Sequence, residues 1–201
     1  MTVLAVDLAA KYSAACVMGD DYTVIKQFDS WGISEATFIY YVTCAWQYRF
    51  AAPPEILVIE DLPHGLQYSK LVKKVLRLQG RIAQSMYESL EGDIDDILYV
   101  APAAWRSHYE GMQAGTGPNV VVPVAERFGY HPPDFTDRAA GNGGKSRAAK
   151  VATDYCSAYL IARWALDMKA EHGTYDVPGT SRYDTDVILK KDFHAQGEPE
   201  S

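Results

Sequence analysis

The chain has 201 residues, and 48% of them are hydrophobic, which suits a single α/β domain with a buried core. Its three cysteines are widely spaced and form no CxxC pair, so the composition argues against a disulfide framework and against a zinc site. The formal net charge of −7, taken alone, argues against a nucleic-acid partner.

The charges are unevenly distributed along the chain. Residues 62–81 contain five basic residues and no acid, and residues 138–153 contain four basic residues and no acid. Residues 167–201 contain eight acids and four bases. Because local fields rather than net charge attract a polyanion, the two basic stretches keep a nucleic acid among the candidate partners.

The sequence carries no evident targeting signal. No stretch has the length of a membrane-spanning helix, and the first residues lack the basic leader of a signal peptide. We therefore expect a cytoplasmic protein with reduced thiols and no membrane partner.

The N-terminal part of the chain predicts an antiparallel meander followed by a helix and a buried strand. Three strand-like runs joined by short polar turns cover residues 2–9, 13–19 and 22–30. A helix is expected over residues 34–50, with Ser34 as its N-cap. Residues 55–60 are apolar enough for a central parallel strand.

The rest of the chain predicts helices around one more strand. Residues 69–90 form a helical segment, and one apolar stripe along it contains Leu71, Val75, Leu78, Ile82 and Met86. The fifth strand is expected at residues 96–102, and helices near 103–109, 121–128 and 145–169. The order predicts one α/β domain over residues 1–169, built on a mixed five-stranded sheet flanked by helices. The polar, acidic tail at residues 170–201 is expected to be poorly ordered.

Three carboxylates fall at unusual places in this pattern. Asp7 ends the first strand and Glu60 ends the fourth, so the two lie side by side if these strands are neighbours. Asp154 interrupts the apolar face of the last helix, and charged groups are rarely buried without a partner. Strand-end acids also occur in ordinary turns, so Asp7 or Glu60 alone is weak evidence. Together, the three predict a site for Mg²⁺ or Mn²⁺, which can support phosphodiester cleavage.

Four segments resemble the RuvC-type Holliday-junction resolvases, including phage-type variants, within the ribonuclease-H-like fold. They occur in the family's order across residues 2–168 and read "VLAVDLA", "ILVIED", "LRLQGRIAQSM" and "DYCSAYLIARWAL". The resemblance implies a ribonuclease-H-like mixed sheet and a Mg²⁺-dependent endonuclease that cleaves branched DNA. It also implies a homodimer whose two sites cut a four-way junction symmetrically.

The resemblance also implies site residues. Asp7, Glu60 and Asp154 match the family's metal-binding acids. The family often has a fourth acid one helical turn before the last one, but Lys150 and Val151 occupy that turn here. Asp61, Asp137 or the cation of Lys150 could compensate, so Lys150 is a candidate catalytic residue and the fourth ligand stays open.

Candidate DNA-binding residues lie in three places. The resemblance implies that the loop after the Glu60 strand enters the junction, where Leu66 and Tyr68 could wedge or stack against bases, or else simply cover the helix below. Along that helix, the spacing aligns Lys70, Lys74, Arg77 and Arg81 on one stripe, which is either a DNA-binding surface or a solvated face. Lys145 and Arg147 could hold a second DNA arm beside the glycine-rich segment.

Other functions remain open on the sequence alone. An actin-like or sugar-kinase-type phosphotransferase needs two lobes, for which 201 residues are too few. A proofreading exonuclease fits less well, because Leu8 and Ala9 follow Asp7 where a second acid is expected. A ribonuclease-H-like nuclease that acts on RNA or an RNA–DNA hybrid, and a catalytically inactive DNA-binding or scaffold protein of the same fold, both remain alternatives.

Overall fold

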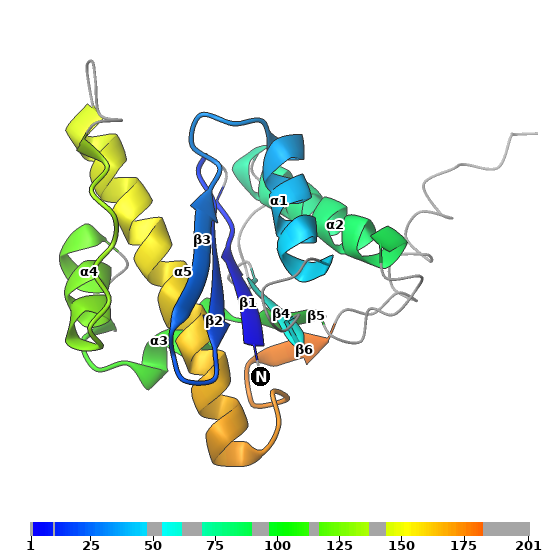
Figure 1. The fold of residues 1–201 in the computed structure, drawn as a ribbon, viewed down its shortest axis with the longest axis vertical. Coiled ribbons are helices and arrows are strands. Elements are labelled where there is room, and N and C mark those ends of the chain that lie inside the picture. Colours follow the sequence, from blue (N-terminus) through cyan, green and yellow to red (C-terminus); the bar gives the residue numbers. More distant parts are fainter. Residues whose placement is uncertain are drawn as a thin grey trace, which may run out of the picture.

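The computed structural model describes residues 2–9, 11–47, 54–61, 70–89, 97–112, 117–136 and 144–182. These residues form a sheet between two layers of helices (Figure 1). The strands are β1 (Thr2–Asp7), β2 (Ala14–Gly19), β3 (Val24–Asp29), β4 (Ile56–Glu60), β5 (Ile97–Val100) and β6 (Thr180–Arg182). The helices are α1 (Glu35–Gln47), α2 (Lys70–Ser89), α3 (Pro102–His108), α4 (Pro118–Arg127) and α5 (Gly144–His172).

The strand order is β3-β2-β1-β4-β5-β6. The first three strands pair antiparallel, as the sequence predicts for a meander. Strand β4 pairs parallel with both β1 and β5, which confirms the predicted central parallel strand. The carboxyl ends of β1, β4 and β5 therefore meet at one edge of the sheet, where the chain leaves each strand.

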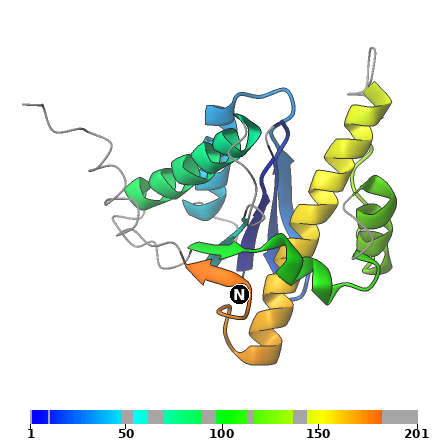
Figure 2. The ribbon, with the colours of Figure 1, turned by 180° about the vertical axis from the view of Figure 1, so that it is seen from behind.

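Alternating side chains of the strands supply two separate cores. On β1, Val3 and Ala5 belong to the cluster that includes α5, whereas Leu4 and Val6 belong to the cluster that includes α1 and α2. The views from opposite sides show α5 along one face of the sheet and α1 with α2 on the other (Figures 1 and 2). Because strand side chains alternate between the two faces, residue 7 must face α5.

The helices largely follow the sequence pattern. Ser34 caps α1, since its Oγ accepts a hydrogen bond from the backbone N–H of Thr37 at 3.1 Å. In α2 the predicted apolar stripe is buried except at its first position, where Leu71 is 64% exposed. Leu71 lies in the first turn of α2, next to residues 62–69, which are outside the described residues. The apolar stripe of the sequence therefore extends one position beyond the buried part of α2.

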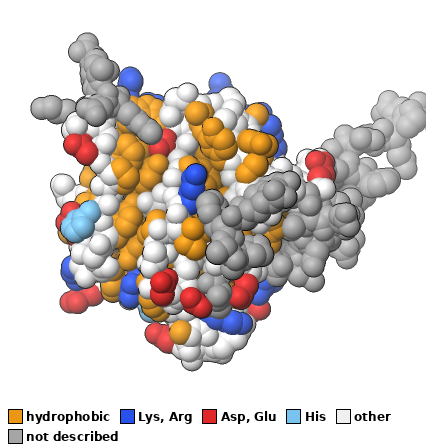
Figure 3. Space-filling model, viewed as in Figure 1, with side chains coloured by type: hydrophobic (Ala, Val, Ile, Leu, Met, Phe, Trp, Pro, Cys, Tyr) orange, Lys and Arg blue, Asp and Glu red, His pale blue; other side chains and the backbone are white. Residues whose placement is uncertain are grey.

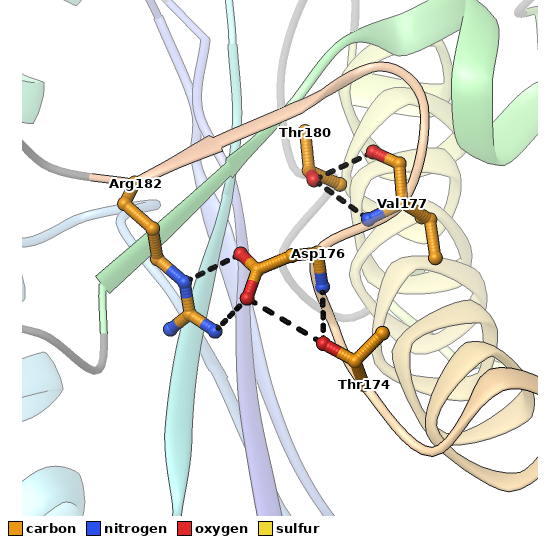
Figure 4. Close-up of polar contacts among 5 residues, drawn as sticks. All are labelled: Thr174, Asp176, Val177, Thr180 and Arg182. Carbon is orange, nitrogen blue, oxygen red and sulfur yellow. Dashed lines mark hydrogen bonds and ion pairs between the residues drawn. The ribbon is translucent and has the colours of Figure 1, made fainter.

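The sheet has six strands where the sequence predicts five, and the extra strand lies in the predicted tail. After α5 the chain turns back, and β6 pairs antiparallel with β5. Figure 4 shows the turn: Arg182 binds Asp176 at 2.7 and 3.0 Å, and the Thr180 hydroxyl donates to the backbone oxygen of Val177 at 2.8 Å. The sheet thus includes residues beyond 169. The rest of that tail, residues 183–201, lies outside the described residues.

Gly179 makes this turn possible. Its φ of +88° lies in the left-handed region, and a Cβ added there would lie 2.6 Å from the Cβ of Ala104 on α3. Its backbone oxygen accepts a hydrogen bond from the N–H of Ala101 at 2.8 Å. The turn therefore fixes the segment that links β5 to α3, directly beside the edge where the strands end.

Hydrophobic side chains gather on the surface over α1 (Figure 3). The most exposed apolar side chains of that helix are Tyr40 and Tyr41. Within the described residues, no helix is long and apolar enough to cross a membrane.

Candidate functional site

Strand register brings the first two predicted carboxylates together. Val6 pairs with Ile59 in the parallel β1–β4 ladder, and Asp7 and Glu60 are the next residues on each strand. Their side chains face α5, because Val3 and Ala5 on β1 and Ile56 and Val58 on β4 do so. The prediction that these strand ends are neighbours is confirmed.

Helix α5 places Asp154 opposite this pair. Its neighbours on the buried face, Val151, Ala158 and Ile161, are fully buried, which holds this side of α5 against the sheet. Asp7, Glu60 and Asp154 line one cavity of about 430 Å³, together with Lys150 and Arg106. We call it the carboxylate cavity. Its other lining residues are Leu8, Ala9, Pro118, Ser146, Ala149, Thr153 and Ser157.

Lys150 pairs with Asp154 across one turn of α5. The distance from Nζ to Oδ1 is 3.1 Å, and 46% of the lysine side chain is exposed, against 7% for Asp154. The second carboxylate oxygen of Asp154 is buried without a hydrogen-bond partner. Such a group costs free energy in a folded protein unless a cation or water satisfies it. Lys150 therefore pairs with only one of the two carboxylate oxygens of Asp154.

Glu60 is held by residues that the sequence analysis did not identify. Its Oε1 accepts hydrogen bonds from Nε1 of Trp105 at 3.0 Å and from a guanidinium nitrogen of Arg106 at 2.7 Å. On the other face, Gln79 of α2 donates to the Glu60 backbone oxygen at 3.2 Å. One signal was available: α3 begins directly after β5, whose end lies at the same edge of the sheet as Glu60.

Burial and the neighbouring carboxyl groups change the pKa of Asp7. Burial raises the pKa of Asp7 well above its usual range, and the negative charges of Glu60 and Asp154 raise it further. The hydrogen bond between the Asp7 and Glu60 carboxyl groups adds to the same shift, and the Lys150 ammonium opposes it. The protonated form of Asp7 is therefore favoured more than in an isolated side chain.

The pKa of Asp154 is also raised, from 3.8 to about 6. Burial is the largest cause, the Lys150 ammonium opposes it, and the charges of Glu60 and Asp29 add to it. Asp29 ends β3 and accepts a hydrogen bond from the Tyr155 hydroxyl at 2.8 Å. The sequence did not indicate that the charge of Asp29 would raise the pKa of Asp154.

The donor chemistry of the cavity fits a hard divalent cation, although the acids are now neutralised in other ways. Among the described residues, no three His, Cys, Asp or Glu side chains are arranged as a complete metal site. The Arg106 guanidinium on Glu60 and the Lys150 ammonium on Asp154 supply positive charge instead, and the raised pKa of Asp7 favours its neutral form. Carboxylate oxygens are the ligands that Mg²⁺ and Mn²⁺ prefer, and the unpartnered Oδ2 of Asp154 is one such donor. The oxygens of Asp7, Glu60 and Asp154 are therefore donors of the right kind for such an ion, although their arrangement in this structure is not that of a metal site.

The candidate fourth ligands are not brought into the cavity. Asp61 follows β4, and its backbone N–H donates to the oxygen of Val100 at 2.8 Å, but its side chain is not among those that line the cavity. Asp137 lies outside the described residues. Lys150 is thus the one compensating candidate that the structure brings to Asp154 within the described part of the chain.

The predicted DNA-binding residues are divided between the two faces of the sheet. Lys70, Lys74, Arg77 and Arg81 are exposed on α2, which lies on the face opposite α5. Arg81 also forms an ion pair with Glu35 of α1. Arg147 is exposed on α5. Leu66, Tyr68 and the side chain of Lys145 lie outside the described residues.

Comparisons with known proteins identify a fold. No protein-family model matches the chain, and no curated protein matches it by sequence. Among solved structures it is similar to T. thermophilus RuvC in complex with a Holliday junction substrate, with a TM-score of 0.57 and 14% sequence identity. The match covers 87% of this chain and 97% of that chain. At this identity the similarity shows the fold alone, and it confirms the expected class: this chain has a RuvC-like, ribonuclease-H-like α/β fold.

Proposed function

We propose that the protein is a divalent-metal-dependent endonuclease that cleaves phosphodiester bonds in branched DNA, such as a four-way junction. The observation that supports this most strongly is that three carboxylates from β1, β4 and α5 line one cavity at the ends of the strands. The RuvC-like fold supports the same reading, since the similar solved structure is a complex with a Holliday junction.

In this proposal Asp7, Glu60 and Asp154 bind Mg²⁺, or Mn²⁺ in its place. When bound, the metal would activate water and stabilise the leaving oxygen. The side chains would then take different partners. With the metal bound, Asp7 and Glu60 would serve as carboxylate ligands, and the Arg106 guanidinium would be placed to bind a phosphate oxygen. Lys150, whose side chain is half exposed, can contact the same phosphate from α5.

The proposal includes two further expectations. We propose that two copies act together, so that two strands of a junction are cut in a symmetric pair. We also propose a cytoplasmic location, which the three free cysteines, Cys16, Cys44 and Cys156, support.

A cleavage assay on matched substrates tests the proposal. The substrates are a four-way junction, a flap and a duplex of DNA, and an RNA–DNA hybrid, all with one labelled strand of the same sequence, incubated with Mg²⁺. We expect fastest cleavage of the junction, with paired incisions in opposite strands. Fastest cleavage of the hybrid would instead assign the protein to the ribonuclease-H-like enzymes that act on RNA. Binding without cleavage of any substrate would identify an inactive DNA-binding protein.

A further inference from the structure

A second, smaller cavity opens at the same edge of the sheet, on the face covered by α1 and α2. It has a volume of about 100 Å³ and is lined by Ala9, Lys11, Ser13, Ser30, Ile33, Glu35, Phe38, Lys74 and Leu78. We call it the serine–lysine cavity. We propose that it binds a backbone phosphate of the nucleic-acid strand that enters the carboxylate cavity. This inference rests on the proposed function and specifies how the strand is held.

The two cavities share one lining residue just after β1. Ala9 lines both of them and lies two residues beyond Asp7. Two residues of extended chain span about 7 Å, so the second cavity lies within a short distance of the catalytic acids. A strand with its reactive phosphate at Asp7 would therefore bring a neighbouring phosphate to the serine–lysine cavity.

Hydrogen bonds fix the walls of the serine–lysine cavity. Ser13 Oγ accepts from the Ala9 N–H at 3.2 Å and donates to the Ala9 oxygen at 3.3 Å, which ties Ala9 to Ser13. Ser30 Oγ accepts from the Ser13 N–H at 2.8 Å, and among the contacts of the described residues it donates to none. Its hydroxyl hydrogen is thus available to a ligand that lies in the cavity and accepts hydrogen bonds.

The charges of the cavity favour an anion. Lys11, which follows β1, and Lys74 of α2 both line the cavity, and both side chains are exposed. The single acid of the wall, Glu35, already pairs with Arg81 of α2. The cavity therefore has a net positive charge, which suits a phosphodiester.

The size of the cavity restricts the ligand further. Its volume of about 100 Å³ corresponds to a few water molecules, which is enough for a phosphate group and too little for a nucleobase with its sugar. A phosphate contact of this kind positions a strand without reading its sequence. This contact also explains how a nucleic acid could reach both the α2 face and the α5 face: the strand would cross the edge of the sheet between the two cavities.

The test compares Lys11→Gln, Lys74→Gln and Ser30→Ala with the matched control Lys73→Gln. Lys73 is exposed on α2 beside Lys74, and it does not line the cavity. Binding of the labelled four-way junction is measured in metal-free buffer over a range of salt concentrations. We expect each cavity lysine variant to lower the slope of log K against log salt by about 0.7–0.9, the value of one lost phosphate contact. Lys73→Gln should leave the slope unchanged.

A second measurement locates the contact. Neutral methylphosphonate linkages are introduced one at a time on either side of the cleaved bond. In the wild type, one position next to the cleaved bond should weaken binding, and in Ser30→Ala and Lys11→Gln that same position should no longer matter. Equal effects of Lys73→Gln and Lys74→Gln, or no sensitive position, would overturn the subsite while cleavage by the wild type would still support the proposed function. A wild type that neither binds nor cleaves nucleic acid would overturn both.

Discussion

At the scale of single residues, Asp154 combines features that are unfavourable in a protein core. It is buried, its Oδ2 has no hydrogen-bond partner, and its charge is repelled by Glu60 and Asp29. Lys150 offsets only part of this. A residue that destabilises the fold in this way is typical of a functional site, where a ligand supplies the missing interaction.

The raised pKa of Asp154 makes a prediction about stability in metal-free buffer. Because its pKa rises from 3.8 to about 6 on folding, only the folded state holds this proton between those pH values, so stability falls as pH rises through that window. Asp154→Asn removes the titration. Urea unfolding should therefore show the variant more stable than the wild type by up to about 3 kcal/mol at pH 7.5, and nearly equal to it at pH 4.

Glu171→Gln is the matched control, because Glu171 is an exposed acid of the same helix. It should change stability little at either pH. An Asp154→Asn variant that is less stable than the wild type at pH 7.5 would show that the carboxylate serves the fold and not a ligand.

Arg106 is the second residue whose role in cleavage can be tested separately from its role in packing. It binds Glu60 at 2.7 Å and lines the carboxylate cavity. In the proposed function it would compete with the metal for Glu60 and then contact the phosphate. We expect Arg106→Gln to lower the single-turnover cleavage rate on the order of 10²-fold, as loss of one donor to a reacting oxyanion does. Arg106→Lys should restore part of the rate, since it keeps the charge.

Calorimetric titration with Mn²⁺ gives an independent readout for Arg106. Removal of the competing cation should leave Mn²⁺ affinity equal to that of the wild type or higher. If Arg106→Gln instead loses Mn²⁺ binding together with cleavage, Arg106 acts by holding the structure of the site and not on the substrate.

At the scale of elements, strand β6 adds a sixth strand to the sheet after α5. Its turn depends on Gly179, which combines a φ of +88° with the close approach of Ala104. Gly32 is a matched control, because its φ is +82° and a Cβ there would meet no atom within 4 Å. Gly32→Ala should cost about 1 kcal/mol of unfolding free energy from backbone strain alone. Gly179→Ala should cost more, because the clash with α3 adds to that strain. Equal losses in urea unfolding would show that the contact between the β6 turn and α3 contributes nothing.

The elements also show what a single sequence can reveal. The meander, the buried strand β4 and the long helix α5 follow from apolar periodicity, and the position of three acids in that periodicity predicted the cavity they line. Strand β6 was missed because three polar residues carry no periodicity, and its pairing with β5 joins segments about 80 residues apart. Trp105 and Arg106 were missed for a related reason: only the position of α3 directly after β5 pointed to this site, and nothing in the α3 residues themselves indicates contact with Glu60 of β4.

At the scale of the whole molecule, the three acids of the carboxylate cavity and the bases of α2 lie on different faces of the sheet. The carboxylate cavity lies between the sheet and α5, whereas Lys70, Lys74 and Arg77 are on α2, across the sheet. The net charge of −7 therefore does not argue against DNA binding. Residues 167–201 contribute eight acids and four bases to that charge, and they lie outside both basic stretches of the sequence. In the proposed path, a nucleic-acid strand crosses the edge of the sheet and contacts both of its faces.

The central claim is that this cavity cleaves phosphodiesters with a divalent metal. The most direct measurement is single-turnover cleavage of a labelled four-way junction in Mg²⁺ and in EDTA, by the wild type, Asp7→Asn, Glu60→Gln, Asp154→Asn and the control Glu171→Gln. We predict cleavage by the wild type and the control in Mg²⁺ alone, and a loss of at least about 10²-fold in each of the three cavity variants, with their folds and DNA binding retained. Cleavage in EDTA, or a wild-type rate in any of the three cavity variants, would contradict it.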